Sequence, residues 1–189
     1  SLLDKILTDE RWDLKFIGMQ IIIEGLALAA FNNMKVILND GLLKQLLHYV
    51  IRDEARHVTF GVNYLEDYIK TLTKAEIEDR AQFAFEACVV MRDRLITGDV
   101  ISRFLDISKE EATRITANSQ QGEHFKNMLF TKIIPNLTRI GLITDKVKPK
   151  YDKLGVLSYQ EMEDNFQPDW AEISKPYETQ EEIEKAIGI

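Results

Sequence analysis

The chain has little cysteine, proline and positive charge, and each shortage excludes a class of protein. Cys88 is the only cysteine among 189 residues, so no internal disulfide can form and a reducing compartment is expected. The four prolines begin at Pro135, which leaves the preceding sequence free of the residue that most readily breaks helices. The formal net charge is -7 and the pI is near 5.1. Proteins that wrap nucleic acid need clustered cationic side chains, so we expect no nucleic-acid partner.

The chain also lacks a comfortable membrane span and a recognisable secretion signal. Its most apolar segment, Phe16–Phe31, contains Gln20 and Glu24 and is shorter than the roughly 20 apolar residues that cross a bilayer. The N-terminus begins Ser-Leu-Leu-Asp-Lys, with neither a basic start nor a small-residue cleavage site. We therefore expect a cytoplasmic protein with no membrane partner.

The distribution of apolar and turn residues predicts an all-α fold. The segment from Asp9 to Leu38 is rich in Ile, Leu, Ala and Met, which predicts one long buried helix, and Asn39-Asp40-Gly41 supplies its stop. A second helix is predicted from Leu42 to about Leu72. No internal repeat and no alternating strand pattern is present in the sequence.

Two capping boxes mark the starts of later helices. In Thr73-Lys74-Ala75-Glu76 and in Ser108-Lys109-Glu110-Glu111, a hydroxyl and a carboxylate three residues later can satisfy the first free backbone N–H groups. The first box predicts a helix that runs to about Thr97. The second predicts a helix that ends at Ile134, because Pro135 lacks the N–H needed to continue undisturbed.

The sequence changes character after Gly141. Lysines, glycine and three of the four prolines alternate there with acidic and polar residues, which predicts loops with little core. We therefore predict a helical domain over residues 1–145 and an irregular C-terminal extension over residues 146–189. Within the extension, Thr179–Glu182 has the spacing to start one short helix.

Two carboxylates and one imidazole stand at helical spacing in the first two predicted helices. Glu54 and His57 recur with Leu47 and Gly61 at three- and four-residue steps or their sums, the spacing of one helix face. Both side chains are therefore predicted to point where the apolar residues point. Glu24 lies in a similar apolar stripe on the preceding helix and is also predicted to point inward.

Two inward carboxylates on neighbouring helices need compensation. Moving a carboxylate out of water costs several kcal/mol unless a cation or hydrogen-bond donors compensate, and Glu24 and Glu54 would also repel each other. A bound cation resolves both problems. Mixed oxygen and imidazole ligands suit iron or manganese, and ligand type does not exclude zinc. The alternative is that Glu24 and His57 lie at the edge of the bundle and are satisfied by Arg52, Arg56 or water.

The pattern Ile23-Glu24-Gly25, followed by Arg52-Asp53-Glu54-Ala55-Arg56-His57, resembles the C-terminal half of the ferritin-like di-iron carboxylate proteins. The resemblance is most specific from Trp12 to Tyr68. It is nearest to the small subunit of class I ribonucleotide reductase and its oxidase relatives, including the arylamine N-oxygenases. It implies a ferritin-like antiparallel helical bundle, of which this chain would hold half together with additional helices, and a cofactor of two iron ions or of iron and manganese.

The resemblance also implies roles for individual residues. Glu24, Glu54 and His57 would be metal ligands. Asp53 would hydrogen-bond a ligand histidine and fix its orientation, with a surface salt bridge as the alternative. Family members carry a further carboxylate and a further Glu-x-x-His on two earlier helices, and none of these precedes Glu24 here, where only 23 residues remain.

Other polar residues are predicted to be structural. Glu86 lies in an apolar run and would pair with Arg92 or Arg56. Adjacent residues on a helix diverge by about 100°, so Glu123 and His124 cannot share one face. The remaining candidates are His48, which has no carboxylate three residues away, and Tyr64 and Tyr68, which match no radical-forming tyrosine of the reductases and are predicted to pack.

The ligands missing from the predicted metal site could be supplied in two ways. In the first, the chain is the C-terminal piece of a longer enzyme whose missing N-terminal half carries the other ligands, which fits a first residue, Ser1, that is not an initiator methionine. Alternatively, a two-fold homodimer would build a four-helix bundle from two copies of the first two helices, with four carboxylates and two histidines. A third arrangement is a metal-free bundle. We favour the first two, because an exposed Phe16–Phe31 face would invite association.

The predicted function is that of a di-iron, or iron and manganese, carboxylate oxidoreductase that activates dioxygen and acts on a small molecule. The protein would hold two ions with open coordination positions, and carboxylates suit this task because they can bridge or shift as the metals change charge. The alternative is a non-catalytic protein, either a metal-binding bundle or a structural helical dimerisation module. The sequence identifies neither the substrate nor the redox partner.

Overall fold

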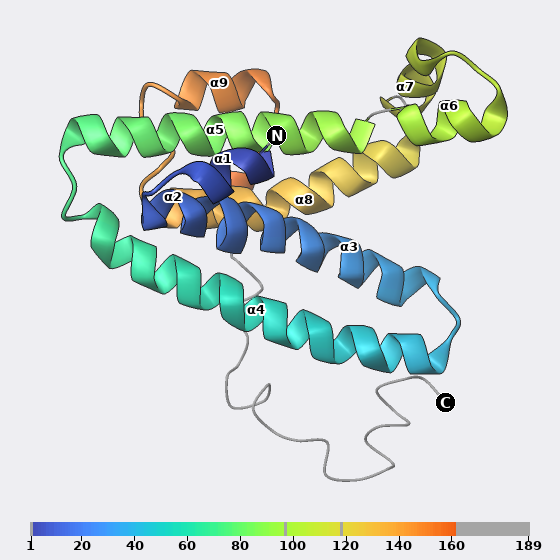
Figure 1. Ribbon diagram of the computed structural model, residues 1–189, viewed down its shortest axis with the longest axis horizontal. Coiled ribbons are helices and arrows are strands. Elements are labelled where there is room, and N and C mark those ends of the chain that lie inside the picture. The colour runs from blue at the N-terminus through green and yellow to red at the C-terminus, as the bar shows by residue number, and fades with distance from the viewer. Residues whose placement is uncertain (1, 97, 118, 162–189) are drawn as a thin grey trace, which may run out of the picture.

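The computed structural model describes residues 2–96, 98–117 and 119–161, and this part of the chain contains helices and connecting turns but no strand. Four long helical segments form its body: residues 12–37, α4 (Gly41–Ile69), α5 (Lys74–Ile96) and α8 (Gln120–Arg139). The segment 12–37 lies between α4 on one side and α5 on the other, and α8 contacts both α5 and this segment (Figure 1). The prediction of an all-α fold is confirmed.

The first long segment differs from a simple helix. It begins at Trp12 as α2 (Trp12–Phe16), widens into a π-helix over Ile17–Ile23, and continues as α3 (Glu24–Ile37). A separate short helix, α1 (Leu2–Thr8), precedes it and was not expected. π-helical turns are rare and frequently lie at functional sites. Here the wide turn ends at Glu24, the first predicted ligand.

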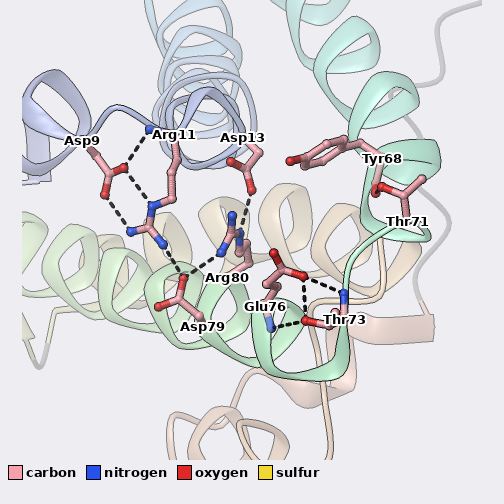
Figure 2. Close-up of polar contacts among 9 residues, drawn as sticks. All are labelled: Asp9, Arg11, Asp13, Tyr68, Thr71, Thr73, Glu76, Asp79 and Arg80. Atoms are coloured by element: carbon pink, nitrogen blue, oxygen red, sulfur yellow. Dashed lines mark hydrogen bonds and ion pairs between the residues drawn. The ribbon is translucent and has the colours of Figure 1, made fainter.

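The starts of α4 and α5 follow the predicted signals. Asp40 caps α4, since its carboxylate accepts a hydrogen bond from the backbone N–H of Leu43 at 2.7 Å. At the start of α5, Thr73 N donates to Glu76 Oε2 at 2.8 Å and Glu76 N lies 3.3 Å from Thr73 Oγ1, which is the reciprocal capping box (Figure 2). These local hydrogen bonds confirm the predicted boundaries.

The predicted fourth helix is two helices, which is a correction. α7 (Lys109–Ala117) ends before Ser119, and Ser119 caps α8 by accepting a hydrogen bond from the N–H of Gly122 at 2.9 Å. A further short helix, α6 (Asp99–Leu105), lies between α5 and α7. A serine can bond to nearby backbone groups, so it favours a helix start over a helix interior.

The prediction that Pro135 ends this helix is also wrong. α8 passes through Pro135 and ends at Arg139. Ile133 and Ile134 before the proline and Leu137 after it are completely buried. A proline inside a helix costs about 3 kcal/mol. Burying one leucine or isoleucine contributes about 1.5–3 kcal/mol, so the buried positions on both sides offset that cost.

The described part of the C-terminal region belongs to the core. α9 (Lys148–Lys153) and a 3₁₀ turn over Leu157–Glu161 follow α8, and Val147, Tyr151 and Val156 are fully buried. Tyr151 Oη lies 4.0 Å from the Sγ of Cys88, and burial raises the pKa of Cys88 to about 12. The expectation of loops with little core is therefore wrong for residues 142–161. The short helix predicted at Thr179 lies outside the described residues.

A network of ion pairs fixes the beginning of the long segment to α5 (Figure 2). The guanidinium of Arg80 donates to Asp13 at 2.7 Å, and the two side chains are only 9% and 2% exposed. Arg11 pairs with Asp9 at 2.8 Å and with Asp79 at 2.7 Å. The buried pair joins α2 to α5, directly before the π-helix that leads to Glu24.

The segment Trp12–Ile37 is long and apolar enough to cross a membrane by length and composition, with a mean hydropathy of 1.7 in its best window. It is 26 residues long, so the expectation that it is too short does not hold. Of that window, 44% is buried against other helices of the fold, and the core helix of a soluble protein meets the same criteria.

Candidate metal centre

The three predicted ligands converge where α3 begins and the middle of α4 passes it. One ligand atom from each of Glu24, Glu54 and His57 lies within 4.8 Å of the others. His57 Nδ1 is 3.5 Å from Glu54 Oε2 and 3.8 Å from Glu24 Oε1. Residues 30 positions apart in the sequence thus form one cluster of two carboxylates and one imidazole.

The cluster lies at the border between the core and the surface. The side chains of Glu24 and Glu54 are 15% and 24% exposed, whereas that of His57 is 61% exposed. The prediction that His57 points with the apolar residues is therefore wrong for the described chain. The buried face of α4 is formed by Ala55, Val58 and their neighbours, and His57 is rotated by about 100° from Val58.

Glu24 carries the electrostatic cost of this arrangement. Its Oε2 atom is buried and has no hydrogen-bond partner among the described residues. Burial raises the pKa of Glu24, the neighbouring charge of Glu54 raises it further, and His57 opposes both effects. A carboxylate in this position lacks the donor or cation that normally compensates for lost hydration.

Asp53 adopts the surface salt bridge that was the alternative to its role beside a ligand histidine. Its carboxylate accepts a hydrogen bond from Arg56 Nη1 at 3.2 Å and lies 3.8 Å from Arg52 Nε, and the side chain is 56% exposed. Although the two arginines flank Glu54, neither satisfies Glu24 Oε2. The part of the alternative in which an arginine compensates this oxygen is therefore not observed, whereas His57 lies at the edge of the bundle as that alternative expects.

Gln20 lies one helical turn from the cluster, where the π-helix packs against α4. It lies four residues before Glu24 in the π-helix and faces Gly61, which lies four residues after His57. A Cβ atom on Gly61 would stand 2.5 Å from Gln20 Cβ, so only glycine permits this approach. Sequence reasoning did not select Gln20, and its polar side chain within an apolar run was the available signal.

Exposed apolar residues flank the cluster along α4, with the charged Asp53 between Leu46 and His57 on the same face. Leu46, Phe60 and Tyr64 are 57%, 60% and 55% exposed and recur with His57 at three- and four-residue steps or their sums. We call these four residues the outer face of α4. A groove of about 520 Å³ adjoins this face at Phe60 and Tyr64. It is lined by Phe60, Asn63, Tyr64, Asp67, Tyr68 and Thr71.

Tyr64 and Tyr68 pack against Trp12, which agrees with the prediction that they are packing residues. The ring centroids of Tyr68 and Trp12 are 4.5 Å apart, and those of Tyr64 and Trp12 are 5.3 Å apart. Such contacts stabilise the start of the long segment.

The other ionisable candidates have ordinary structural surroundings. Glu86 pairs with Lys5 at 3.0 Å and accepts a hydrogen bond from Gln82, so the predicted arginine partner is wrong. Glu123 pairs with Lys126 at 2.8 Å. Burial lowers the pKa of His48, and the positive charges of Lys35 and Arg52 lower it further. His124 is exposed.

The cluster has the donor set and nearly the size of a cation site. Ligand atoms on opposite sides of an ion at about 2.1 Å lie about 4.2 Å apart, so the 4.8 Å spread needs only small side-chain rotations. Two oxygen donors and one imidazole nitrogen suit iron, manganese or zinc. A cation would also compensate Glu24 Oε2, the buried oxygen without a partner. The residues therefore fit a metal ion on three protein ligands.

Comparisons with known proteins give no relative for this chain: no protein-family model, no curated protein and no solved structure matches it.

Proposed function

We propose that Glu24, Glu54 and His57 form one half of a dinuclear metal centre of the ferritin-like di-iron carboxylate type, in an oxidoreductase that activates dioxygen. The observation that supports the proposal is the buried Oε2 of Glu24, which has no hydrogen-bond partner and lies beside a second carboxylate. Two such groups are costly in a folded protein unless a cation is bound between them. The cofactor would be two iron ions, or iron and manganese.

The residues of the chain would have distinct tasks in this centre. Glu24 and Glu54 would neutralise the positive charge of the ions, and the imidazole of His57 would provide a neutral nitrogen ligand. Bound iron would supply the electrons that dioxygen needs to react with a small molecule. The partly buried position of both carboxylates would limit access of water to the ions.

The outer face of α4 is where the second half of the centre would dock. Leu46, Phe60 and Tyr64 are more than half exposed there, on the same side of the helix as His57. A helix pair that covered this face would bury the apolar side chains and bring further ligands to His57. That pair is either the α3–α4 pair of a second copy, related by a two-fold axis, or an N-terminal half of a longer protein.

The proposal is tested by measuring metal content and molar mass on the same sample. The purified chain is incubated anaerobically with Fe(II) or Mn(II), desalted, and analysed by elemental analysis and by size-exclusion chromatography with light scattering. For a symmetric centre we expect two metals per dimer. If the second half is an N-terminal segment, we expect a monomer or a mixed assembly that retains one weakly bound metal per chain.

Two variants decide whether the metal is held by the cluster. Glu54→Ala should remove the bound metal, because it deletes one of three ligands. Glu66→Ala is the matched control, since Glu66 lies on the same helix, is similarly exposed at 30%, and pairs with Arg139 away from the cluster. Wild-type protein without metal in every condition refutes the proposal, as does equal metal loss in both variants.

The exposed outer face of α4 also favours a second function, that of a structural helical dimerisation module. Phe60 and the adjacent groove would then serve to bind another helix, and the carboxylates would have no metal. A dimer that contains no metal, and that Phe60→Ser converts to a monomer, would identify this alternative.

A further inference from the structure

Two buried acceptor oxygens without partners lie one helical turn apart at the candidate centre. They are Gln20 Oε1 and Glu24 Oε2, on the π-helix and at its end. Side chains four residues apart on a helix lie on neighbouring positions of the same face. Neither oxygen can satisfy the other, because both only accept hydrogen bonds when Glu24 is ionised. Both oxygens therefore need a donor that the described residues do not supply.

Gly61 holds Gln20 in this layer. An added Cβ on Gly61 would be 2.5 Å from Gln20 Cβ and 3.0 Å from Gln20 Cγ, so the stem of the glutamine occupies the space that a larger residue would fill. Gly61 follows His57 by one helical turn. The stem of Gln20 is thereby held one helical turn from the predicted ligands, and the Oε1 atom of its amide is buried.

A glutamine that only filled space would be a poor choice at this position. A buried oxygen without a hydrogen-bond donor costs about 1–3 kcal/mol, and an apolar side chain of the same length would avoid that cost. A glutamine is favoured at position 20 if a hydrogen-bond donor reaches its Oε1 atom when a metal ion is bound at the centre. A water ligand of a cation is such a donor, because the charge of the ion polarises its O–H bonds.

We propose that Gln20 is a positioning residue of the metal centre: its Oε1 accepts a hydrogen bond from a water ligand of the cation that Glu24, Glu54 and His57 hold. This inference rests on the proposed metal site and adds the residue that orients one of its open coordination positions. Hydrogen-bond partners around a metal site typically change metal affinity 10–100-fold when they are removed.

The test uses Gln20→Met and Gln20→Glu in the full chain. Methionine keeps the length and volume but removes the acceptor, whereas glutamate keeps an acceptor at the same place. Thermal unfolding is measured with EDTA, and Mn(II) affinity is measured by calorimetric titration. Met19→Leu is the matched control, since Met19 lies on the same π-helix and is not one of the residues of the cluster.

For Gln20→Met we expect unchanged or higher thermal stability without metal, but weaker binding of Mn(II). Without metal, Gln20→Met should unfold at the same temperature as the wild type or higher. Its Mn(II) affinity should be about 10-fold weaker. Gln20→Glu should bind Mn(II) at least as tightly as the wild type, and Met19→Leu should leave the affinity unchanged.

Other results overturn the inference and separate it from the proposed function. Wild-type affinity in Gln20→Met would show that Gln20 only packs, and the metal site would stand. If Gln20→Met fails to fold, a 10-fold loss of affinity in Gln20→Glu would equally refute the acceptor role. Absence of Mn(II) binding in the wild type would refute both the metal site and the role of Gln20.

Discussion

Glu24→Gln should stabilise the metal-free protein and abolish its stabilisation by metal. In the wild type the carboxylate is 15% exposed, its Oε2 has no partner, and the adjacent charge of Glu54 disfavours its ionised form. The amide is nearly isosteric but uncharged, so it removes the repulsion and lowers the cost of burial. We expect the free energy of unfolding at neutral pH to rise by about 1–2 kcal/mol.

The magnitude can be measured by thermal unfolding. For a protein of this size, 1 kcal/mol corresponds to about 2–4 °C in melting temperature, so the variant should melt about 2–8 °C higher in EDTA. A ligand at 100 times its dissociation constant stabilises a protein by about 2.7 kcal/mol. Saturating Mn(II) should therefore raise the melting temperature of the wild type above that of the variant, and leave the variant unchanged.

Circular dichroism melts of both proteins at pH 7.5, with EDTA and with Mn(II), provide the assay. Glu10→Gln is the control for the loss of one negative charge, because Glu10 is exposed and not part of the cluster. Two results would refute the reasoning. A variant less stable than the wild type in EDTA would mean that Glu24 has a favourable partner in the metal-free protein. Equal stabilisation of both proteins by Mn(II) would mean that Glu24 does not bind the ion.

Two further predictions concern other charged groups. Arg80→Met should lower the free energy of unfolding by about 3–5 kcal/mol, because it leaves the buried carboxylate of Asp13 unpaired, and urea unfolding should show that the double variant Asp13→Leu/Arg80→Met recovers most of the loss. His48→Gln should reduce the loss of stability on acidification. The pKa of His48 is lowered in the folded protein. Between the unfolded value near 6.5 and the lower folded value, the unfolded state binds more protons than the folded state, so the free energy of unfolding decreases as the pH decreases. Urea unfolding at pH 5, 6, 7 and 8 would contradict this if both proteins had the same pH dependence.

Local signals predicted the parts of the fold that local hydrogen bonds determine. The capping box of Thr73 and Glu76 and the cap at Asp40 are formed as expected, because each requires only residues within one helical turn. The continuation of α8 through Pro135 depends instead on burial of Leu137 in a core built by distant residues. Burial of Tyr151 beside Cys88 likewise joins segments 63 positions apart, and no local pattern encodes that contact.

At the candidate site, too, local patterns predicted some features, whereas contacts between distant residues determine the others. Helical periodicity predicted that Glu24 and Glu54 would approach each other, since both lie in apolar stripes of neighbouring helices. The π-helix before Glu24 was not predictable, because its wide turn depends on packing against α4 and α5 and has no established sequence signal. Gln20 lies opposite Gly61 on α4, and this contact between two helices is not encoded by any local pattern.

The one ligand that periodicity placed wrongly is informative about the assembled protein. His57 was predicted to be inward because it shares a stripe with apolar residues, and it is 61% exposed in the described chain together with Phe60 and Tyr64. Periodicity reports the environment in which a sequence is stable, including surfaces that a partner covers. The proposed docking of a helix pair on the outer face of α4 would bury His57 together with Phe60 and Tyr64. Exposure of His57 should therefore fall on assembly, and slower reaction of its imidazole with diethyl pyrocarbonate in the assembly than in the monomer, both kept free of metal with EDTA, would measure that change. Equal reactivity in both states would show that no helix covers this face.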